Sequence, residues 1–282
     1  MKQQHMDKKL IRQRFDRHAF EYDQYAHIQR RMAQWLLDHI PPKLNVQSIL
    51  EIGCGTGILT LELRRRYPEA ELMVIDLAPA MLTETKKKLN EQAAGMPLTS
   101  YMEGDAESIM PRLAEERPRS FDLIVSSATF QWFNEPELTA LACLHCLKPE
   151  GSFLFSTFAE RTFEELKVSF RAAEKALNIE AIQHGQEFFA AEQWRNVFIH
   201  SGKALQWSEE LHIEHYPTTS SFLHTVQRIG ASNATQSSGR SNGLAGRTLL
   251  KAMEQYYQDH YSIGSSIQAT YHLGYGIISN RP

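Results

Sequence analysis

The chain has 282 residues, which is long enough for one large α/β domain with insertions and a full hydrophobic core. Its formal net charge of -3 at pH 7 and a pI near 6.5 argue against a nucleic-acid polyanion as the main partner. The sequence has no apolar run near the roughly 20 residues that a membrane helix needs, no secretory signal at its start and only 3 cysteines, so we expect a cytoplasmic protein without a membrane partner.

Residues 7–40 are predicted to form two helices, and the two prolines that follow end the second. This segment contains the pattern F-D-x-x-A-x-x-Y-D, formed by Phe15, Asp16, Ala19, Tyr22 and Asp23. On a helix, Phe15, Ala19 and Tyr22 share one face, which either packs in the core or covers a binding site. For Tyr22 we favour a function, because a phenol offers a ligand both an apolar edge and a hydroxyl.

The next segment, ILEIGCGTG at 49–57, is a short apolar strand that runs into three glycines at alternate positions and then into a predicted helix. Glycines at such a turn let the backbone approach a ligand that side chains would block. One helix later, the apolar run ELMVIDLAPAML contains Asp76 at the end of its strand. A carboxylate at this position accepts hydrogen bonds from both hydroxyls of a ribose. The pattern therefore predicts a nucleoside-binding site.

The spacing of the glycines indicates which nucleoside is bound. In the dinucleotide fingerprint G-x-G-x-x-G the last glycine comes one residue later than here. With Glu51 two residues before the first glycine, the segment instead resembles the E/D-x-G-x-G-x-G signature of class I S-adenosylmethionine-dependent methyltransferases. The resemblance implies that S-adenosylmethionine is the cofactor and S-adenosylhomocysteine the product. It also implies that the cofactor contacts Glu51, Gly53, Cys54, Gly55, Gly57, Asp76, Leu77, Met81, Asp105, Ala106 and Ser127.

Three further segments fall where that superfamily has its motifs. LTSYMEGDAESI predicts a strand followed by Asp105, whose counterpart in the superfamily accepts the adenine amino group. FDLIVSSATFQWF predicts a buried strand that opens at the pocket mouth into Ser127, Gln131 and Trp132. LKPEGSFLFSTF predicts a turn into the fifth strand. Each signal is weak alone, and their common order and spacing make them strong.

We expect a single domain over 1–282 with a Rossmann-like class I methyltransferase fold. Strands and helices alternate over 48–158, which predicts a cofactor-binding core of parallel strands with crossover helices. Two late strands, at 204–216 and 266–279, complete a seven-stranded, mostly parallel sheet whose last strand is antiparallel. Helical insertions at 160–200 and 218–262 are predicted to form a substrate cap at the carboxyl edge of the sheet, together with the N-terminal lid at 7–40.

The residue types that the sequence lacks indicate which kind of chemical group accepts the methyl. An acceptor that is already anionic needs only alignment and removal of water, whereas an amine or phenol more often requires a base. No histidine stands out as a base, and no metal-ligand cluster is present, so we expect no metal. Cys143 and Cys146 form a lone C-x-x-C pair within a helical pattern, which favours ordinary packing. These features weakly favour a carboxylate acceptor.

From about Lys9 to Ile278 the sequence resembles one family, the malonyl-acyl-carrier-protein O-methyltransferases of biotin synthesis. The resemblance rests on the N-terminal pattern, ILEIGCGTG and SATFQW, and on the late segments VQRIGASNAT, GLAGRTLLKAMEQYY and ATYHLGYGI. It implies methylation of the free carboxylate of a malonyl thioester, with an acidic acyl carrier protein or coenzyme A as the handle. In related lids the tyrosine that matches Tyr22 lies near the donor methionine and the acceptor, which implies a catalytic role for Tyr22.

A malonyl carboxylate needs fixed donors, and arginine pairs with a carboxylate through two parallel hydrogen bonds. Arg228 is our first choice for positioning the carboxylate, with Arg247 as the second, and both join Gln131 and Trp132 in the predicted substrate pocket. Arg240, Arg247 and Lys251 form a plausible docking patch for an acidic carrier protein.

Other functions stay open at this point. The chain is alternatively a methyltransferase for a free small acid such as aconitate or for a quinone ring. An NAD-dependent oxidoreductase is disfavoured by the glycine spacing. An adenosylmethionine-binding regulator without turnover is excluded only by an activity measurement.

Overall fold

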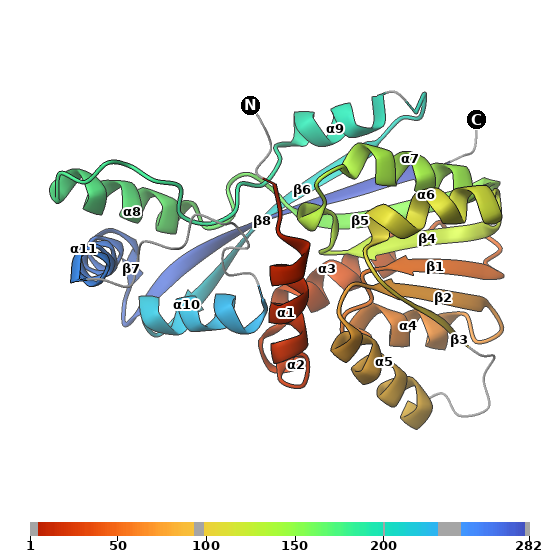
Figure 1. Ribbon diagram of the computed structural model, residues 1–282, viewed down its shortest axis with the longest axis horizontal. Helices are drawn as coiled ribbons and strands as arrows, with labels where there is room; N and C mark the ends of the chain where they lie inside the picture. The colour runs from red at the N-terminus through yellow and green to blue at the C-terminus, as the bar shows by residue number, and fades with distance from the viewer. Residues whose placement is uncertain (1–4, 93–98, 200, 231–243, 280–282) are drawn as a thin grey trace.

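The computed structural model describes residues 5–92, 99–199, 201–230 and 244–279. Its central element is one mixed sheet with helices on both faces (Figure 1). The strands are β1 (Ser48–Ile52), β2 (Glu71–Asp76), β3 (Thr99–Glu103), β4 (Phe121–Ser127), β5 (Leu147–Phe158), β6 (Gln206–Tyr216), β7 (Ser262–Ile263) and β8 (Ser266–Ser279).

The strand order is β3-β2-β1-β4-β5-β8-β6, and the short β7 pairs with β8. Neighbours from β3 to β5 are parallel, whereas β8 runs antiparallel to both β5 and β6. This confirms the predicted fold class, including the antiparallel last strand. The two-residue β7, which forms a tight hairpin with β8, was not predicted.

Two groups of helices cover the faces of the sheet. One face carries α3 (His27–Asp38), α4 (Ile58–Arg66) and α5 (Pro79–Gln92), and the other carries α6 (Ala106–Glu116), α7 (Pro136–Cys146) and α9 (Ala191–Ile199). Adjacent residues of β1 point into opposite cores: Leu50 packs beneath α6 and α7, and Ile49 packs beneath α3 and α4. All five residues of β1 are buried, as is typical of a parallel strand covered on both sides.

The N-terminal segment differs from the prediction, because three helices replace the expected two. They are α1 (Lys8–His18), the single turn α2 (Tyr22–Tyr25), and α3. The break after α1 is fastened by the His18 ring, whose Nδ1 lies 2.8 Å from Glu21 Oε1. Phe15 and Tyr22 therefore stand on separate helices, yet they still pack in one cluster with Ala19.

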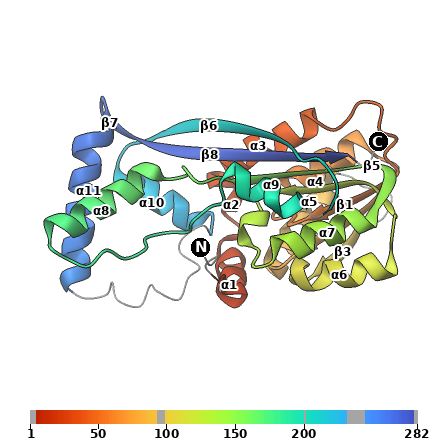
Figure 2. The same ribbon diagram turned by 90° about the horizontal axis from the view of Figure 1, so that it is seen from above.

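A group of helices gathers at the far end of the long strands β6 and β8 (Figure 2). We call these helices the cap: α8 (Glu164–Ala176), α10 (Thr219–Arg228) and α11 (Leu244–Tyr261). They share a core with the first half of β8, including Phe222, Tyr257 and Tyr271. The predicted insertion at 160–200 is divided, because α9 packs on α7 through Trp194 instead of joining the cap.

Candidate active site

The glycine turn follows directly from the end of β1. Gly53, Gly55 and Gly57 have φ angles of +75°, +53° and +87°, a region that residues with a side chain seldom adopt. A Cβ atom built on Gly53 would lie 2.0 Å from Thr129 Oγ1, so this position also has no room for a side chain. The Gly53 amide donates to the carbonyl of Ile75 at 2.7 Å, which ties the turn to the end of β2.

Asp76 lies at the carboxyl end of β2 and faces the same turn. Its Oδ2 accepts a hydrogen bond from the Gly55 amide at 2.8 Å, and its Oδ1 accepts one from the Ala78 amide at 2.8 Å. Burial raises the pKa of Asp76 to about 6, although both amides oppose this by stabilising the anion. Each carboxylate oxygen keeps further lone-pair capacity for ligand hydroxyls.

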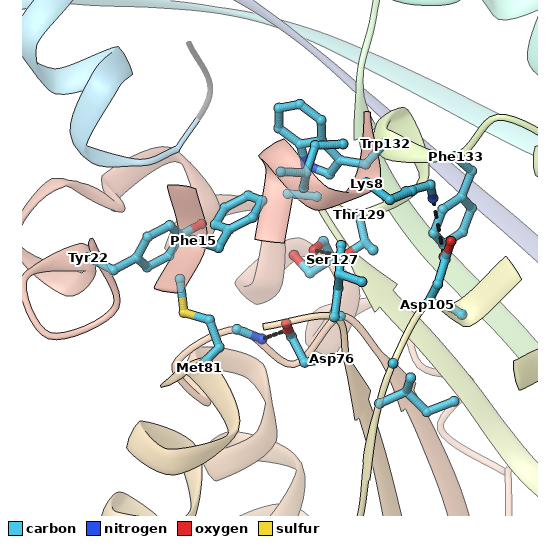
Figure 3. A pocket seen from close by; sticks show the side chains of 18 residues that line it. Lys8, Phe15, Tyr22, Asp76, Met81, Asp105, Ser127, Thr129, Trp132 and Phe133 are labelled. Atoms are coloured by element: carbon cyan, nitrogen blue, oxygen red, sulfur yellow. Dashed lines mark hydrogen bonds and ion pairs between the residues drawn. The ribbon is translucent and has the colours of Figure 1, made fainter. Parts of the chain in front are cut away.

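A pocket of about 90 Å³ lies above Asp76 and beneath α1. Figure 3 shows Phe15, Tyr22 and Met81 on one side, Lys8, Asp105, Trp132 and Phe133 on the other, and Ser127 and Asp76 between them. Lys8, Ile11 and Phe15 of α1 form one wall of this pocket, so the lid helix contributes directly to the site. The wall of the pocket includes most of the residues predicted for the cofactor, namely Gly53, Gly55, Asp76, Leu77, Met81, Asp105, Ala106 and Ser127.

Glu51 and Cys54 line a smaller adjoining cavity of about 40 Å³, which also reaches Tyr22 and Ser127. Glu51 is 1% exposed, and its Oε2 has no hydrogen-bond partner among the described residues. Burial raises the pKa of Glu51 to about 8, and nearby Asp76 contributes in the same direction. An unpartnered buried carboxylate oxygen is unfavourable unless a cation or donor reaches it, so this cavity suits a ligand ammonium group.

The raised pKa of Glu51 predicts an unusual pH dependence of stability. The folded protein holds the proton up to about pH 8 and the unfolded chain releases it near 4.5, so the free energy of unfolding falls as pH rises through this window, with a slope of up to about 1.4 kcal/mol per unit. In ligand-free protein, Tm should therefore decline from pH 6 to 8, and Glu51→Gln should flatten the curve. Thermal scans of wild type, Glu51→Gln and the exposed control Glu91→Gln test this. Equal slopes in all three would contradict it.

The lid places aromatic rings over the pocket. The centroid of the Phe15 ring lies 6.4 Å from that of Tyr22 and 5.7 Å from that of Trp132, in an edge-on contact with the latter. Burial raises the pKa of Tyr22 far above its usual value, so its phenol stays protonated. Lys8 also belongs to the lid: its Nζ lies 3.2 Å from Asp105 Oδ1 and pairs with Glu107 as well. Opening of the lid would release Asp105.

Two aspartates of the lid pattern connect the lid to the site by hydrogen bonds. The sequence alone had indicated no role for them. Asp16 Oδ1 accepts a hydrogen bond from the Ala80 amide at 3.0 Å, at the start of α5. Asp23 accepts one from Thr56 Oγ1 in the glycine turn and one from Lys88 Nζ on α5, both at 2.5 Å. The pattern F-D-x-x-A-x-x-Y-D could have indicated this role, because Asp16 and Asp23 are as far apart in the sequence as the two aromatic residues.

Of the residues predicted for the substrate pocket, some line the pocket and others do not. Trp132 lines the pocket, whereas Gln131 is buried and bonded to its own turn, donating to the Ala128 carbonyl at 2.6 Å and accepting from Thr157 Oγ1 at 3.1 Å. Arg228, at the end of α10, pairs with Glu21 of the lid and donates to His224 at 3.1 Å. It does not line the pocket, so its role as a carboxylate clamp stays a prediction.

Two basic residues of the predicted docking patch and the C-x-x-C cysteines lie away from the pocket. Arg247 and Lys251 are exposed on α11, while Arg240 lies outside the described residues, so the docking patch also stays a prediction. Cys143 and Cys146 are buried free thiols, and burial raises the pKa of Cys146 to about 11. Within the described ranges, no cluster of three or more His, Cys, Asp or Glu residues could hold a metal ion. None of the helices in the same ranges is long and apolar enough to cross a membrane.

The methyltransferase domain family matches residues 50–155. A malonyl-acyl-carrier-protein O-methyltransferase from Brevibacillus brevis is 35% identical over 274 residues, covering 96% of this chain and 95% of the relative. One of the same name from Priestia megaterium is 34% identical over 278 residues, covering 95% and 96%.

Solved structures show the fold at lower identity. The YcgJ protein from Bacillus subtilis superposes with a TM-score of 0.58 at 15% identity, covering 91% of this chain and 99% of that one. Phosphoethanolamine N-methyltransferase 2 from Haemonchus contortus, solved with phosphomonomethylethanolamine and S-adenosylhomocysteine, gives a TM-score of 0.55 at 14% identity, covering 96% and 60%. The methyltransferase domain implies the use of S-adenosylmethionine.

Proposed function

This chain belongs to the malonyl-acyl-carrier-protein O-methyltransferase family, and from that premise we propose that it methylates the free carboxylate of a malonyl thioester in biotin synthesis. The observation that carries the proposal is the similarity over nearly the whole chain to relatives of that name, lid and cap included. Because the chain belongs to a methyltransferase family, the alternative function of an NAD-dependent oxidoreductase is excluded.

The pocket and its adjoining cavity fit S-adenosylmethionine group by group. The orphan carboxylate oxygen of Glu51 suits the ammonium of the methionine part, and Asp76 has the lone pairs for both ribose hydroxyls. Asp105, once Lys8 moves, is free to accept the adenine amino group. When bound, the cofactor supplies a methyl group already activated on a sulfonium. We expect no metal to take part.

The lid supplies what a carboxylate acceptor needs. A malonyl carboxylate is anionic at neutral pH, so it requires alignment and a dry site but no general base. Tyr22 suits this role because its phenol stays protonated and donates a hydrogen bond, leaving the other carboxylate oxygen free to attack. Phe15 and Trp132 close the site with apolar surface and exclude water.

The proposal also includes the carrier of the malonyl group and the cellular compartment of the activity. An acidic carrier protein or coenzyme A presents the malonyl group, with no nucleic acid or membrane as partner. We place the activity in the cytoplasm, because the 3 cysteines are all free thiols, as is typical of a reducing compartment.

The direct test is mass spectrometry of malonyl-carrier protein after incubation with the enzyme and S-adenosylmethionine. The expected result is a gain of one methyl group on the carrier-linked malonyl. Parallel incubations with malonyl-coenzyme A, aconitate and a quinol separate the two handles and the alternative acceptors. The proposal fails if the malonyl thioesters gain no methyl group while the cofactor binds normally, which would instead indicate another acceptor or a regulator without turnover.

Tyr22→Phe should lower kcat for malonyl thioesters by roughly 10- to 100-fold, because a hydrogen bond to a charged acceptor is worth about 1.5–3 kcal/mol. The ring and its packing against Phe15 are retained, so the Kd for S-adenosylhomocysteine should not change. Tyr25→Phe, on the same short helix, is the matched control and should behave like wild type. Equal kcat values in the two variants would exclude a role for the Tyr22 hydroxyl.

A further inference from the structure

A second cavity, of about 270 Å³, lies inside the cap and apart from the cofactor pocket. It is enclosed by α8, the segment 184–188 and α10, and its apolar lining consists of Phe163, Leu166, Phe170, Phe188, Leu223 and Val226. Its volume approaches the ~300 Å³ at which ligand pockets usually begin. Nothing in the methyl-transfer geometry described above uses this space.

One polar group at the cavity wall has no partner. Gln186 is only 7% exposed, and its Nε2 donates to the Gln131 carbonyl at 2.5 Å. Its Oε1 is buried without a hydrogen bond to any described residue. Because a buried amide oxygen without a donor is unfavourable, this atom indicates a ligand that brings an N–H group.

Two further polar side chains at the wall, His184 and Lys167, are already held in place. His184 stacks on Phe170 with ring centroids 3.8 Å apart, and its Nε2 lies 2.8 Å from Glu174 Oε1. Lys167 donates to the Glu160 carbonyl at 2.9 Å. The cavity therefore combines a large apolar surface with the amide groups of Gln186 and Gln227, which suits a chain of methylenes interrupted by amides.

The cavity adjoins the acceptor side of the cofactor pocket in two places. On α10, Val226 lines the cavity, while Ile229, less than one turn later, packs in the lid cluster with Tyr22. On the opposite side, Gln186 is bonded to Gln131, the neighbour of Trp132, which lines the cofactor pocket. The cap cavity therefore lies next to the side of the cofactor pocket that the lid covers.

We propose that the cap cavity binds the pantetheine arm of the thioester substrate, an inference that rests on the proposed function. The arm has a gem-dimethyl group and methylenes for the apolar wall, and two secondary amides, one of which donates its N–H to Gln186 Oε1. Carrier protein and coenzyme A share this arm, so the cavity serves both handles. Cavity binding makes the arm, as well as the malonyl group, part of what the enzyme recognises.

The test compares malonyl thioesters that have the arm with malonyl S-ethyl thioester, which has neither amide. Gln186→Leu should raise KM for malonyl-pantetheine about 5- to 10-fold, the effect of one lost hydrogen bond, and should leave KM for the S-ethyl thioester unchanged. Leu223→Trp, which fills the cavity from α10 and keeps the Gln186 amide, should produce the same selective loss. The exposed Gln255→Leu on α11 serves as the matched control.

The outcomes separate the two proposals. Malonyl-coenzyme A and malonyl-carrier protein should show the same selective loss as malonyl-pantetheine, because all three present the arm. If both cavity variants change KM for the pantetheine and S-ethyl thioesters by the same factor, or change neither, the cavity does not bind the arm. If the wild-type enzyme methylates no malonyl thioester at all, the proposed function itself is wrong. Should Gln186→Leu fail to fold, Leu223→Trp decides alone.

Discussion

Asp76→Asn is expected to weaken binding of S-adenosylhomocysteine by about 100- to 1000-fold. The carboxylate offers charged acceptors to two ribose hydroxyls, each hydrogen bond being worth about 1.5–3 kcal/mol. In the wild-type protein the backbone amides of Gly55 and Ala78 each donate to one oxygen of Asp76. In the Asn variant an NH₂ group replaces one of these oxygens, so one of the two backbone amides faces another donor and loses its hydrogen bond. The glycine turn thus loses part of its support together with the ligand contacts.

Isothermal titration calorimetry with S-adenosylhomocysteine measures this effect without turnover. The exposed Asp38→Asn on α3 is the control and should bind like wild type. A thermal scan verifies that Asp76→Asn remains folded. An affinity within threefold of wild type would show that Asp76 does not hold the ribose.

The second large effect is expected at Gly53, where alanine should abolish activity and destabilise the fold by roughly 2–4 kcal/mol. The added Cβ would lie 2.0 Å from Thr129 Oγ1 and 2.8 Å from Thr129 Cβ, and the φ of +75° adds strain of about 1 kcal/mol. Relief requires the Thr129 turn to move, and with it the neighbouring pocket wall.

Gly55→Ala is the matched comparison, because its Cβ would meet no atom within 4 Å. Gly55 lines the pocket, so the methyl group should occupy ligand space and weaken cofactor binding, while the loss of Tm should reflect only the strain of its φ of +53°. Denaturant unfolding and calorimetry on both variants distinguish the two effects. If Gly53→Ala were as stable as Gly55→Ala, the contact with Thr129 would not constrain the turn.

Most residues that the sequence assigned to the cofactor gather around one pocket, because the features that predicted them are local. The glycine turn and Asp76 each follow a buried strand, and parallel strands end at one edge of the sheet, so strand order alone brings these residues together. The same alternation of strands and helices over 48–158 predicted the parallel strands, and the two late strands were read from the segments at 204–216 and 266–279. By contrast, the ends of α1 and α2 depend on a contact between the His18 and Glu21 side chains that helix periodicity does not report.

The acceptor half was less predictable because it depends on distant contacts. Arg228 was chosen for its chemistry, but its partner Glu21 stands 207 residues earlier in the chain and no local pattern indicates the pairing. Gln131 was assigned to the pocket because it follows a strand that ends at the predicted pocket mouth, whereas its side chain bonds to its own turn and to Thr157. The cap cavity is formed by three separate segments, so neither its volume nor the orphan oxygen of Gln186 is visible in the sequence.

The paired strands β6 and β8 extend past the rest of the sheet: β5 pairs only with residues 273–279 of β8, while β6 pairs back to Ile267. The cap therefore packs on an extension of the sheet that only β6 and β8 form. The strands that bear the nucleoside site contribute little to the core of the cap. This gives the fold a modular character. Substitutions within the cap should therefore change which methyl acceptors fit, while the strands that bear the nucleoside site keep their own cores.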